Sequence, residues 1–163
     1  MEEYILKVLS QSTLRYFEAI GATGAALGTP YLGGDKESAG LGYSSVIGIS
    51  GTYRGNIYYT ASRDKLMALL PLLGETRPDE NLCSELVGEI TNTISGNARE
   101  QLGGGFMISP PFILQARPLT VHPLRNVPLY VLPISWKQLH SSLLIALSKE
   151  PDSPDTAPLY PRD

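Results

Sequence analysis

The spacing of apolar residues along the chain predicts two long helices. Over residues 2–20, apolar side chains recur mostly every three or four positions, with charged and polar side chains between them, which is the pattern of an amphipathic helix. The longest pattern of this kind spans residues 82–102, and its apolar face comprises Cys83, Leu86, Val87, Ile90, Ile94, Ala98 and Leu102. Glycines at positions 21, 24 and 103–105 are expected to end the two helices, because glycine adopts the left-handed cap conformation at little steric cost.

Shorter patterns between and after these helices predict a third helix and several strands. Residues 44–50 and 54–60 are rich in β-branched and aromatic side chains and are separated by a short turn, which predicts a β-hairpin. Residues 64–73 predict a short helix with Ser62 as its N-cap and with Pro71 fraying its end. Residues 21–42 are expected to form a short extended piece and a loop.

The C-terminal half of the chain is expected to be β-structure followed by a tail. Strands are predicted over residues 106–113, 128–134 and 142–146, and ten of the thirteen prolines lie beyond residue 109, which opposes a long helix there. The whole pattern predicts an α+β fold, with three helices (two of them long) on one face of a mostly antiparallel sheet of about five to six strands. One domain is expected over residues 1–148, and the Pro- and Asp-rich residues 149–163 are expected to be disordered.

Composition and charge narrow the classes of function. The chain has 163 residues, a formal net charge of −3 and only scattered Lys and Arg, whereas a nucleic-acid binder usually carries a basic stripe. It has no apolar run of about 18–20 residues that could cross a membrane, and its acidic start does not resemble a secretory signal. The single cysteine, Cys83, excludes an internal disulfide framework. We therefore expect a cytoplasmic protein that binds neither nucleic acid nor membrane.

The residues that could carry chemistry are Glu89 and Asn92 on the helix predicted over residues 82–102. They are three positions apart, so they are neighbours on the helix surface, about 5–6 Å between Cβ atoms, and they lie opposite the apolar face. A carboxylate can bind a basic side chain of a partner, and a carboxamide offers an acceptor and two donors that can orient a water molecule. This combination would suit hydrolysis of an acyl phosphate, where positioning and charge stabilisation dominate.

Plainer interpretations compete with this one. Exposed glutamates are common on helices, so the pair by itself could be an ordinary solvated face. Gly88 and Gly96 each cost about 1 kcal/mol relative to alanine within a helix, and they could allow close approach either of a partner or of the sheet. The two histidines and Cys83 form no metal-ligand spacing, and residues 28–36 lack the Lys and Ser/Thr of a phosphate-binding loop.

The sequence around the pair resembles a known family. Residues 85–98 (ELVGEITNTISGNA) look like the active-site helix of the CheC/CheX/FliY chemotaxis phosphatases, in which a Glu-x-x-Asn pair is followed by Gly-Asn-Ala. Residues 46–55 (VIGISGTYRG) are similar to the family hairpin, and residues 106–113 (FMISPPFI) resemble the strand after the active helix. Glu85 stands where members often have Asp or Ser. The first helix has no second Glu-x-x-Asn pair, because the residue three positions after Glu18 is Gly21 and not Asn. The resemblance is therefore to the one-site CheX type.

The resemblance implies a specific activity. A CheX-like phosphatase would hydrolyse the aspartyl phosphate of a CheY-type response regulator, with Glu89 binding the regulator's lysine and Asn92 orienting the attacking water. Glu85, Gly88 and Gly96 would contact the partner. The protein would need no cofactor of its own, because the regulator would carry the Mg²⁺, and it would be a homodimer. The alternative is a non-catalytic module on the same fold that binds a response regulator or acts as an adaptor.

Overall fold

The main feature of the fold is one antiparallel sheet, seen in a computed structural model that describes residues 2–34, 37–39, 42–115, 119–122 and 124–149. In spatial order its strands are β1 (Ala26–Leu27), β9 (Leu129–Trp136), β10 (Leu139–Lys149), β5 (Tyr53–Ala61), β4 (Tyr43–Gly51) and β6 (Phe106–Ile108). Two short strands share the outer positions, since β2 (Tyr31–Leu32) also pairs with β9 and β7 (Phe112–Gln115) also pairs with β4. The sheet is therefore six positions wide.

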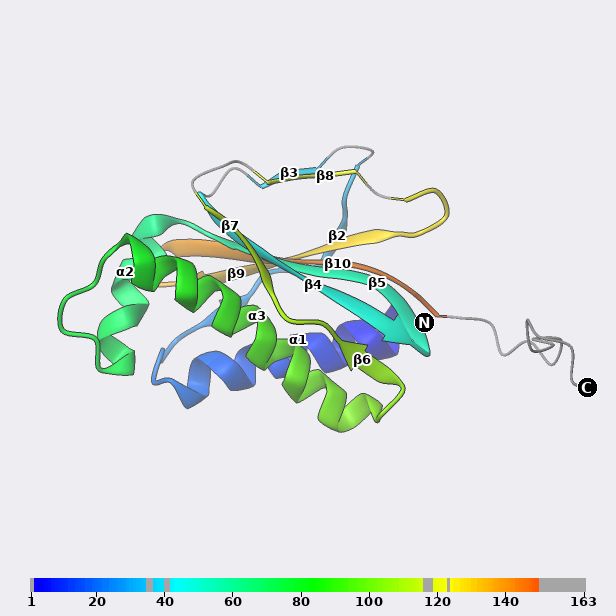
Figure 1. Cartoon of the computed structure of the whole chain (residues 1–163), viewed down its shortest axis with the longest axis horizontal. Coiled ribbons are helices and arrows are strands. Elements are labelled where there is room, and N and C mark those ends of the chain that lie inside the picture. The colour runs from blue at the N-terminus through cyan, green and yellow to red at the C-terminus, as the bar shows by residue number, and fades with distance from the viewer. Residues whose placement is uncertain (1, 35–36, 40–41, 116–118, 123, 150–163) are drawn as a thin grey trace, which may run out of the picture.

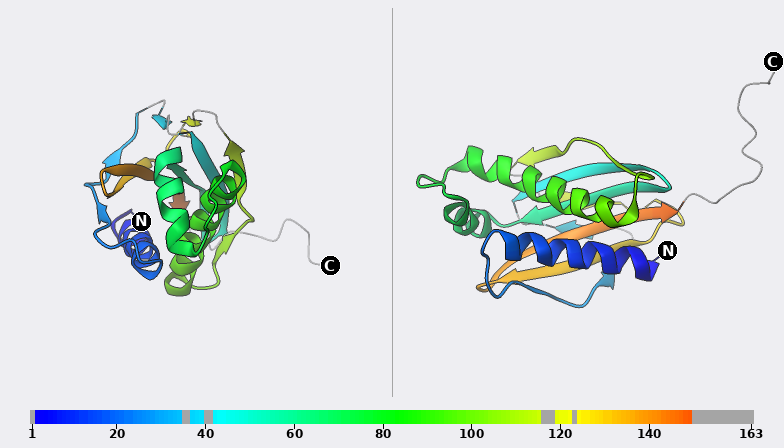
Figure 2. Two further views of the ribbon diagram at one scale, coloured as in Figure 1. Left: turned by 90° about the vertical axis from the view of Figure 1, so that its left-hand side faces the viewer. Right: turned by 90° about the horizontal axis from the view of Figure 1, so that it is seen from below.

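Three helices cover one face of this sheet (Figure 1). They are α1 (Glu2–Ala19), α2 (Arg63–Leu69) and α3 (Glu80–Leu102), and a 3₁₀ helix, η1 (Leu70–Leu73), continues α2. Figure 2 shows α1 and α3 side by side along the sheet, with α2 at the end where α3 begins. The expected α+β fold, with a mostly antiparallel sheet and two long helices among three, is confirmed.

The larger hydrophobic core lies between the helices and the sheet. Ile5, Leu9 and Phe17 of α1 and Leu86, Ile90 and Ile94 of α3 are buried in it. A second, smaller cluster lies on the opposite face of the sheet and comprises Val121, Leu129, Val131, Leu144 and Ala146. A separate two-stranded ladder of β3 (Glu37–Ala39) and β8 (Leu119–Val121) lies on that side (Figure 1). Both faces of the central strands are thus apolar, as strands covered on both sides must be.

The hairpin that the sequence predicts is formed by β4 and β5. The two strands are paired from Tyr43 opposite Ala61 to Ile49 opposite Gly55. Gly51 has a φ of 98°, and a Cβ there would lie 2.2 Å from the carbonyl oxygen of Gly105. The turn therefore requires glycine at position 51 both for its left-handed conformation and for the close approach of the Gly105 backbone, just before β6.

The prediction of one continuous strand over residues 106–113 is wrong. It is two strands, β6 and β7, separated at Ser109, Pro110 and Pro111. The two prolines have no N–H to donate to a ladder, and the Ser109 hydroxyl instead accepts a hydrogen bond of 2.8 Å from the backbone N–H of Gly48. Both strands still pair with β4, so the prolines interrupt the edge of the sheet without redirecting the chain.

Other boundaries differ from the prediction by a few residues. The short helix predicted over residues 64–73 is α2, which begins at Arg63, where the Ser62 side chain accepts a hydrogen bond from the Lys65 N–H. It continues as the 3₁₀ helix η1, which contains Pro71. The extended piece predicted within residues 21–42 is present as β1, β2 and β3. Lys149 still belongs to β10, where it pairs with Tyr53, so the predicted tail begins one residue inside a strand. Residues 150–163 lie outside the described part of the chain.

Candidate functional site

The outward face of α3 carries the candidate site. Glu85, Glu89, Asn92 and Arg99 are exposed, while Cys83, Leu86, Val87, Ile90, Ile94 and Ala98 are buried. Glu89 and Asn92 lie in the middle of a helix of 23 residues, away from both of its ends. The expectation that both side chains face solvent on the same side is confirmed, because the helical period that buries the apolar face of α3 also turns this pair outward.

Buried hydroxyl groups attach α3 to the sheet directly beneath the pair. The Ser45 hydroxyl of β4 donates a 2.9 Å hydrogen bond to the Val87 carbonyl oxygen and also contacts the Thr91 hydroxyl. The Thr91 hydroxyl lies 2.9 Å from the same carbonyl oxygen. Ser45 and Thr91 are both buried, and hydrogen bonds in such surroundings are costly to break. The turn of helix that carries Glu89 and Asn92 is therefore held in place.

Gly88 lies on the side of α3 that faces β7 and not on the outward face. A Cβ at this position would lie 3.0 Å from Ile113 Cδ1 and 3.6 Å from Pro111 Cγ. The glycine allows helix and strand to approach closely, so of the two explanations that the sequence leaves open for Gly88, the structure favours packing against the sheet. Gly96 differs, because nothing lies within 4 Å of the position of its Cβ.

A small hollow opens beside Glu89, between η1 and the first half of α3. It has a volume of about 210 Å³ and is lined by Leu70, Leu73, Glu75, Leu82, Glu85, Leu86 and Glu89. Glu85 and Glu89 thus share one concave surface, whereas Asn92 lies outside it. The sequence pattern does not indicate this hollow. It places Leu86 on the apolar face of the long helix, and only the packing of η1 beside α3 brings Leu70 and Leu73 close to it.

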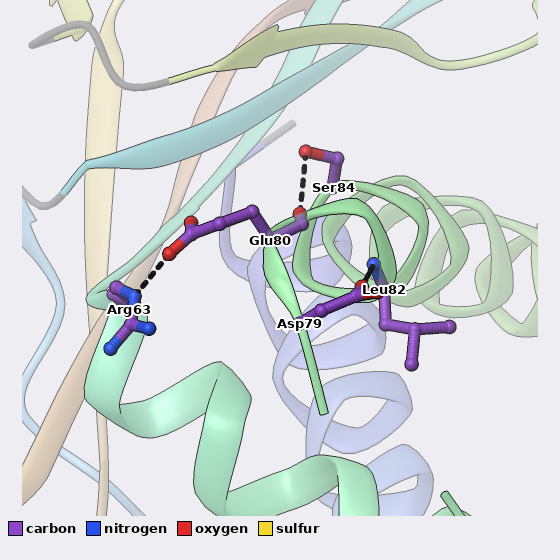
Figure 3. A network of polar contacts seen from close by, with 5 residues as sticks. All are labelled: Arg63, Asp79, Glu80, Leu82 and Ser84. Carbon is purple, nitrogen blue, oxygen red and sulfur yellow. Dashed lines mark hydrogen bonds and ion pairs between the residues drawn. The ribbon is translucent and has the colours of Figure 1, made fainter. Parts of the chain in front are cut away.

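Polar contacts gather at the start of α3, and one of them joins it to the start of α2 (Figure 3). Arg63 of α2 lies 2.5 Å from the Glu80 carboxylate, measured from its Nε atom. The Asp79 side chain caps α3 by accepting a 2.8 Å hydrogen bond from the Leu82 N–H. Because Arg63 and Glu80 are largely exposed, their ion pair adds little to stability.

Tyr16 of α1 lies close enough to Glu89 for the carboxylate to affect its ionisation. Burial, and to a smaller extent the charge of Glu89, raises the pKa of Tyr16 above its usual value. Its hydroxyl is buried without a hydrogen-bond partner among the described residues. Tyr16 is therefore a neutral phenol at physiological pH, and it contributes no charge that could offset Glu89.

The described residues offer neither a metal site nor a membrane-spanning helix. No three His, Cys, Asp or Glu side chains gather there where they could hold a metal ion, and Cys83 is buried as expected of a small core residue. No helix in this part of the chain is long and apolar enough to cross a membrane.

An antiparallel sheet with three helices on one face is the CheC/CheX-like fold. The family model described as "Chemotaxis phosphatase CheX" matches residues 43–135, a range that contains the hairpin, α3 and most of β9. The chain belongs to the CheX family.

Solved structures of relatives have the same fold. A protein from Desulfovibrio vulgaris Hildenborough assigned to chemotaxis is 25% identical, with a TM-score of 0.77 over 89% of this chain and 97% of its own. A CheC-like superfamily protein from Shewanella sp. PV-4 is 23% identical, with a TM-score of 0.79 over 91% and 99%. A complex of CheX with CheY, BeF₃ and Mg²⁺ from Borrelia burgdorferi matches at 17% identity, with a TM-score of 0.74 over 88% and 97%. Comparison with curated protein sequences gives no significant match.

Proposed function

We propose that this protein is a phosphatase that hydrolyses the aspartyl phosphate of a CheY-type response regulator. The observation that carries the proposal is the exposure of Glu89 and Asn92 side by side on the anchored middle of α3. A pair that must enter the phosphorylated pocket of another protein has to project from its own surface and keep its geometry. Membership of the CheX family, and the solved complex of a relative with CheY, support this class of partner.

Each residue of the pair has its own role in this proposal. The Glu89 carboxylate accepts charge-assisted hydrogen bonds from a lysine of the regulator, which fixes the orientation of the two proteins. The Asn92 carboxamide accepts a hydrogen bond from a water molecule and holds it in line with the phosphorus–oxygen bond that breaks. Water attacks the phosphorus, the regulator's aspartate leaves as a carboxylate, and inorganic phosphate is released. The Mg²⁺ that neutralises the phosphoryl oxygens belongs to the regulator.

The surroundings of the pair supply the remaining contacts. Glu85 lies one turn before Glu89 and is exposed, and Gly96 lies one turn after Asn92 with open space in front of it. We place both in the contact with the regulator. Gly88 would act indirectly, by letting α3 lie close to β7. The homodimer expected from the family resemblance stays a prediction, which sedimentation equilibrium of the purified chain would measure.

Two substitutions test the division of roles. Asn92→Ala should lower the rate of phosphoryl loss at saturating chain by about 10²–10³-fold, the range for losing one well-placed polar group, while binding to the regulator persists. Glu89→Ala should weaken binding by about 1.5–3 kcal/mol, as expected for loss of hydrogen bonds to a charged group. Both side chains are exposed, so neither change should unfold the protein. Glu3→Ala, an exposed glutamate on the first turn of α1, is the control.

The alternative is a module that binds a regulator without catalysis. It predicts that the phosphorylated regulator loses its phosphoryl group at the spontaneous rate even when all of it is bound. In that case Asn92→Ala would change nothing, and Glu89→Ala would change only the affinity.

A further inference from the structure

Beneath Glu89 and Asn92, three oxygen atoms form a buried cluster that joins α3 to the sheet. The Ser45 hydroxyl of β4 and the Thr91 hydroxyl of α3 contact each other, and each lies 2.9 Å from the Val87 carbonyl oxygen. Two hydroxyl protons serve these three contacts, so one hydroxyl can donate to the carbonyl while the other donates either to it or to its neighbouring hydroxyl. Every such arrangement leaves α3 hydrogen-bonded to β4.

The cluster lies within the helical turn that carries the acid–amide pair. Residues 87–91 span that turn, with Glu89 inside it and Asn92 directly after it. The buried hydroxyls of α1, Ser12 and Thr13, bond to carbonyl oxygens of their own helix and to no strand among the described residues. In the site-bearing helix, by contrast, a buried hydroxyl is linked to the sheet at the candidate site itself.

Folding stability gives only a weak reason for hydroxyl groups at positions 45 and 91. Replacing both partners of a buried hydrogen bond by apolar groups of the same shape can be nearly neutral for stability. Apolar contacts tolerate repacking and lose uniqueness before they lose stability, whereas a hydrogen bond also has a preferred direction. The cluster therefore restricts rotation of α3 about its axis and sliding along β4, the two motions that would displace Glu89 and Asn92.

We propose that Ser45 and Thr91 are positioning residues for the phosphatase reaction, an assignment that rests on the proposed function. Both are buried, so they do not touch the regulator and act through the helix, by fixing the orientation at which Asn92 holds the attacking water. In-line attack is sensitive to placement, since a displacement of about 1 Å can cost about 10²-fold in rate. The attraction of Glu89 to a lysine depends less steeply on distance, so loss of the cluster should lower the rate more than the affinity.

Two neighbouring serines give a matched test. Ser44, like Ser45, is fully buried, but its hydroxyl donates to that of Thr60, in a pair that joins β4 to β5 and not to α3. Ser45→Ala should lower the rate of phosphoryl loss from the source organism's CheY-type receiver, at a saturating amount of the chain, by about tenfold. The Kd for the receiver loaded with BeF₃ and Mg²⁺ should stay nearly unchanged. Ser44→Ala should leave both the rate and the Kd unchanged, although it also removes a buried hydrogen bond.

Thr91 separates the hydroxyl group from its packing. Thr91→Val keeps the volume of the side chain and removes the hydroxyl, so it should lower the rate. Thr91→Ser keeps the hydroxyl and removes a buried methyl group, so it should lose stability but retain most of the rate. A role in packing alone predicts the opposite order, with the serine variant the more impaired.

The outcomes distinguish this inference from the proposed function. If the unaltered chain does not accelerate phosphoryl loss, the phosphatase proposal falls and the positioning role falls with it. If the unaltered chain accelerates it and Ser45→Ala is as fast as Ser44→Ala, only the positioning role falls. Equal losses of rate in both serine variants would also overturn it, because the rate would then follow general stability. Urea unfolding shows whether each variant is folded in the assay, and if Ser45→Ala is not, the comparison of the two Thr91 variants decides.

Discussion

At the scale of single residues, Lys65 is held in unusual surroundings. Its side chain is fully buried between α2 and the sheet, where Nζ donates a 2.7 Å hydrogen bond to the Ser141 hydroxyl and lies 3.4 Å from the Ile134 carbonyl oxygen. Nζ also lies 5.0 Å from the centre of the Phe17 ring. No described carboxylate pairs with it, and burial lowers its pKa to about 7 because the charged form is poorly solvated there.

This burial predicts a pH dependence of stability. In the unfolded chain a lysine has a pKa of about 10.4. Between about pH 7 and pH 10 the unfolded state therefore binds a proton that the folded state lacks, and the free energy of unfolding should rise with pH, by at most about 1.4 kcal/mol per unit. Below pH 7 both states are protonated, so the contribution stays at its lowest value.

Lys65→Met isolates this contribution from those of other titrating groups. Methionine fills a similar volume without a charge to desolvate, so the variant should be more stable than the unaltered chain at pH 7, by about 1–3 kcal/mol. The advantage should shrink as the pH approaches 10, because the unaltered chain then buries a neutral amine. Urea denaturation at pH 7 and pH 9.5 measures both values. An identical difference at the two pH values would show that Lys65 does not change its protonation on folding.

At the scale of elements, the position of α3 depends on its close approach to β7 at Gly88. A larger side chain there would meet Ile113 and Pro111, and overpacking of this kind typically costs about 1–3 kcal/mol. The helix carries the candidate site, so any shift would move Glu89 and Asn92 relative to the hollow. We expect the helix–strand contact to matter for activity as well as for stability.

Two glycine substitutions on the same helix make this testable. Gly96→Ala should stabilise the protein by about 0.5–1 kcal/mol, because alanine is the better helix former and open space receives its methyl group. Gly88→Ala should not show this gain, and Gly88→Leu should destabilise the protein by at least about 1 kcal/mol. Thermal or urea unfolding of the three variants gives the comparison. Equal stabilisation by alanine at both positions would mean that the approach of α3 to β7 is not tight.

At the scale of the whole molecule, periodic elements could be predicted from the sequence and their assembly could not. The two long helices, the hairpin and the outward orientation of Glu89 and Asn92 follow from local spacing. The order of strands and the short edge strands depend on pairing between distant segments, which no local pattern encodes. The interruption at Pro110 and Pro111 could have been expected, because two consecutive prolines are poorly compatible with a continuous strand.

The same distinction applies to the candidate site. The Glu-x-x-Asn pair lies on one helix and was visible in the sequence, whereas the hollow combines η1, the loop at Glu75 and α3. The burial of Lys65 was not predicted, because the helical pattern of α2 places leucines beside it and gives no sign that a charged residue shares their environment. Features made by two elements packing together required the structure.

The most direct test of the proposed function is the rate of phosphoryl loss from the source organism's CheY-type receiver, measured with and without a saturating amount of this chain. The account predicts that the unaltered chain accelerates hydrolysis well above the spontaneous rate and that Asn92→Ala removes the acceleration without removing the complex. Hydrolysis at the spontaneous rate in a fully formed complex would contradict it.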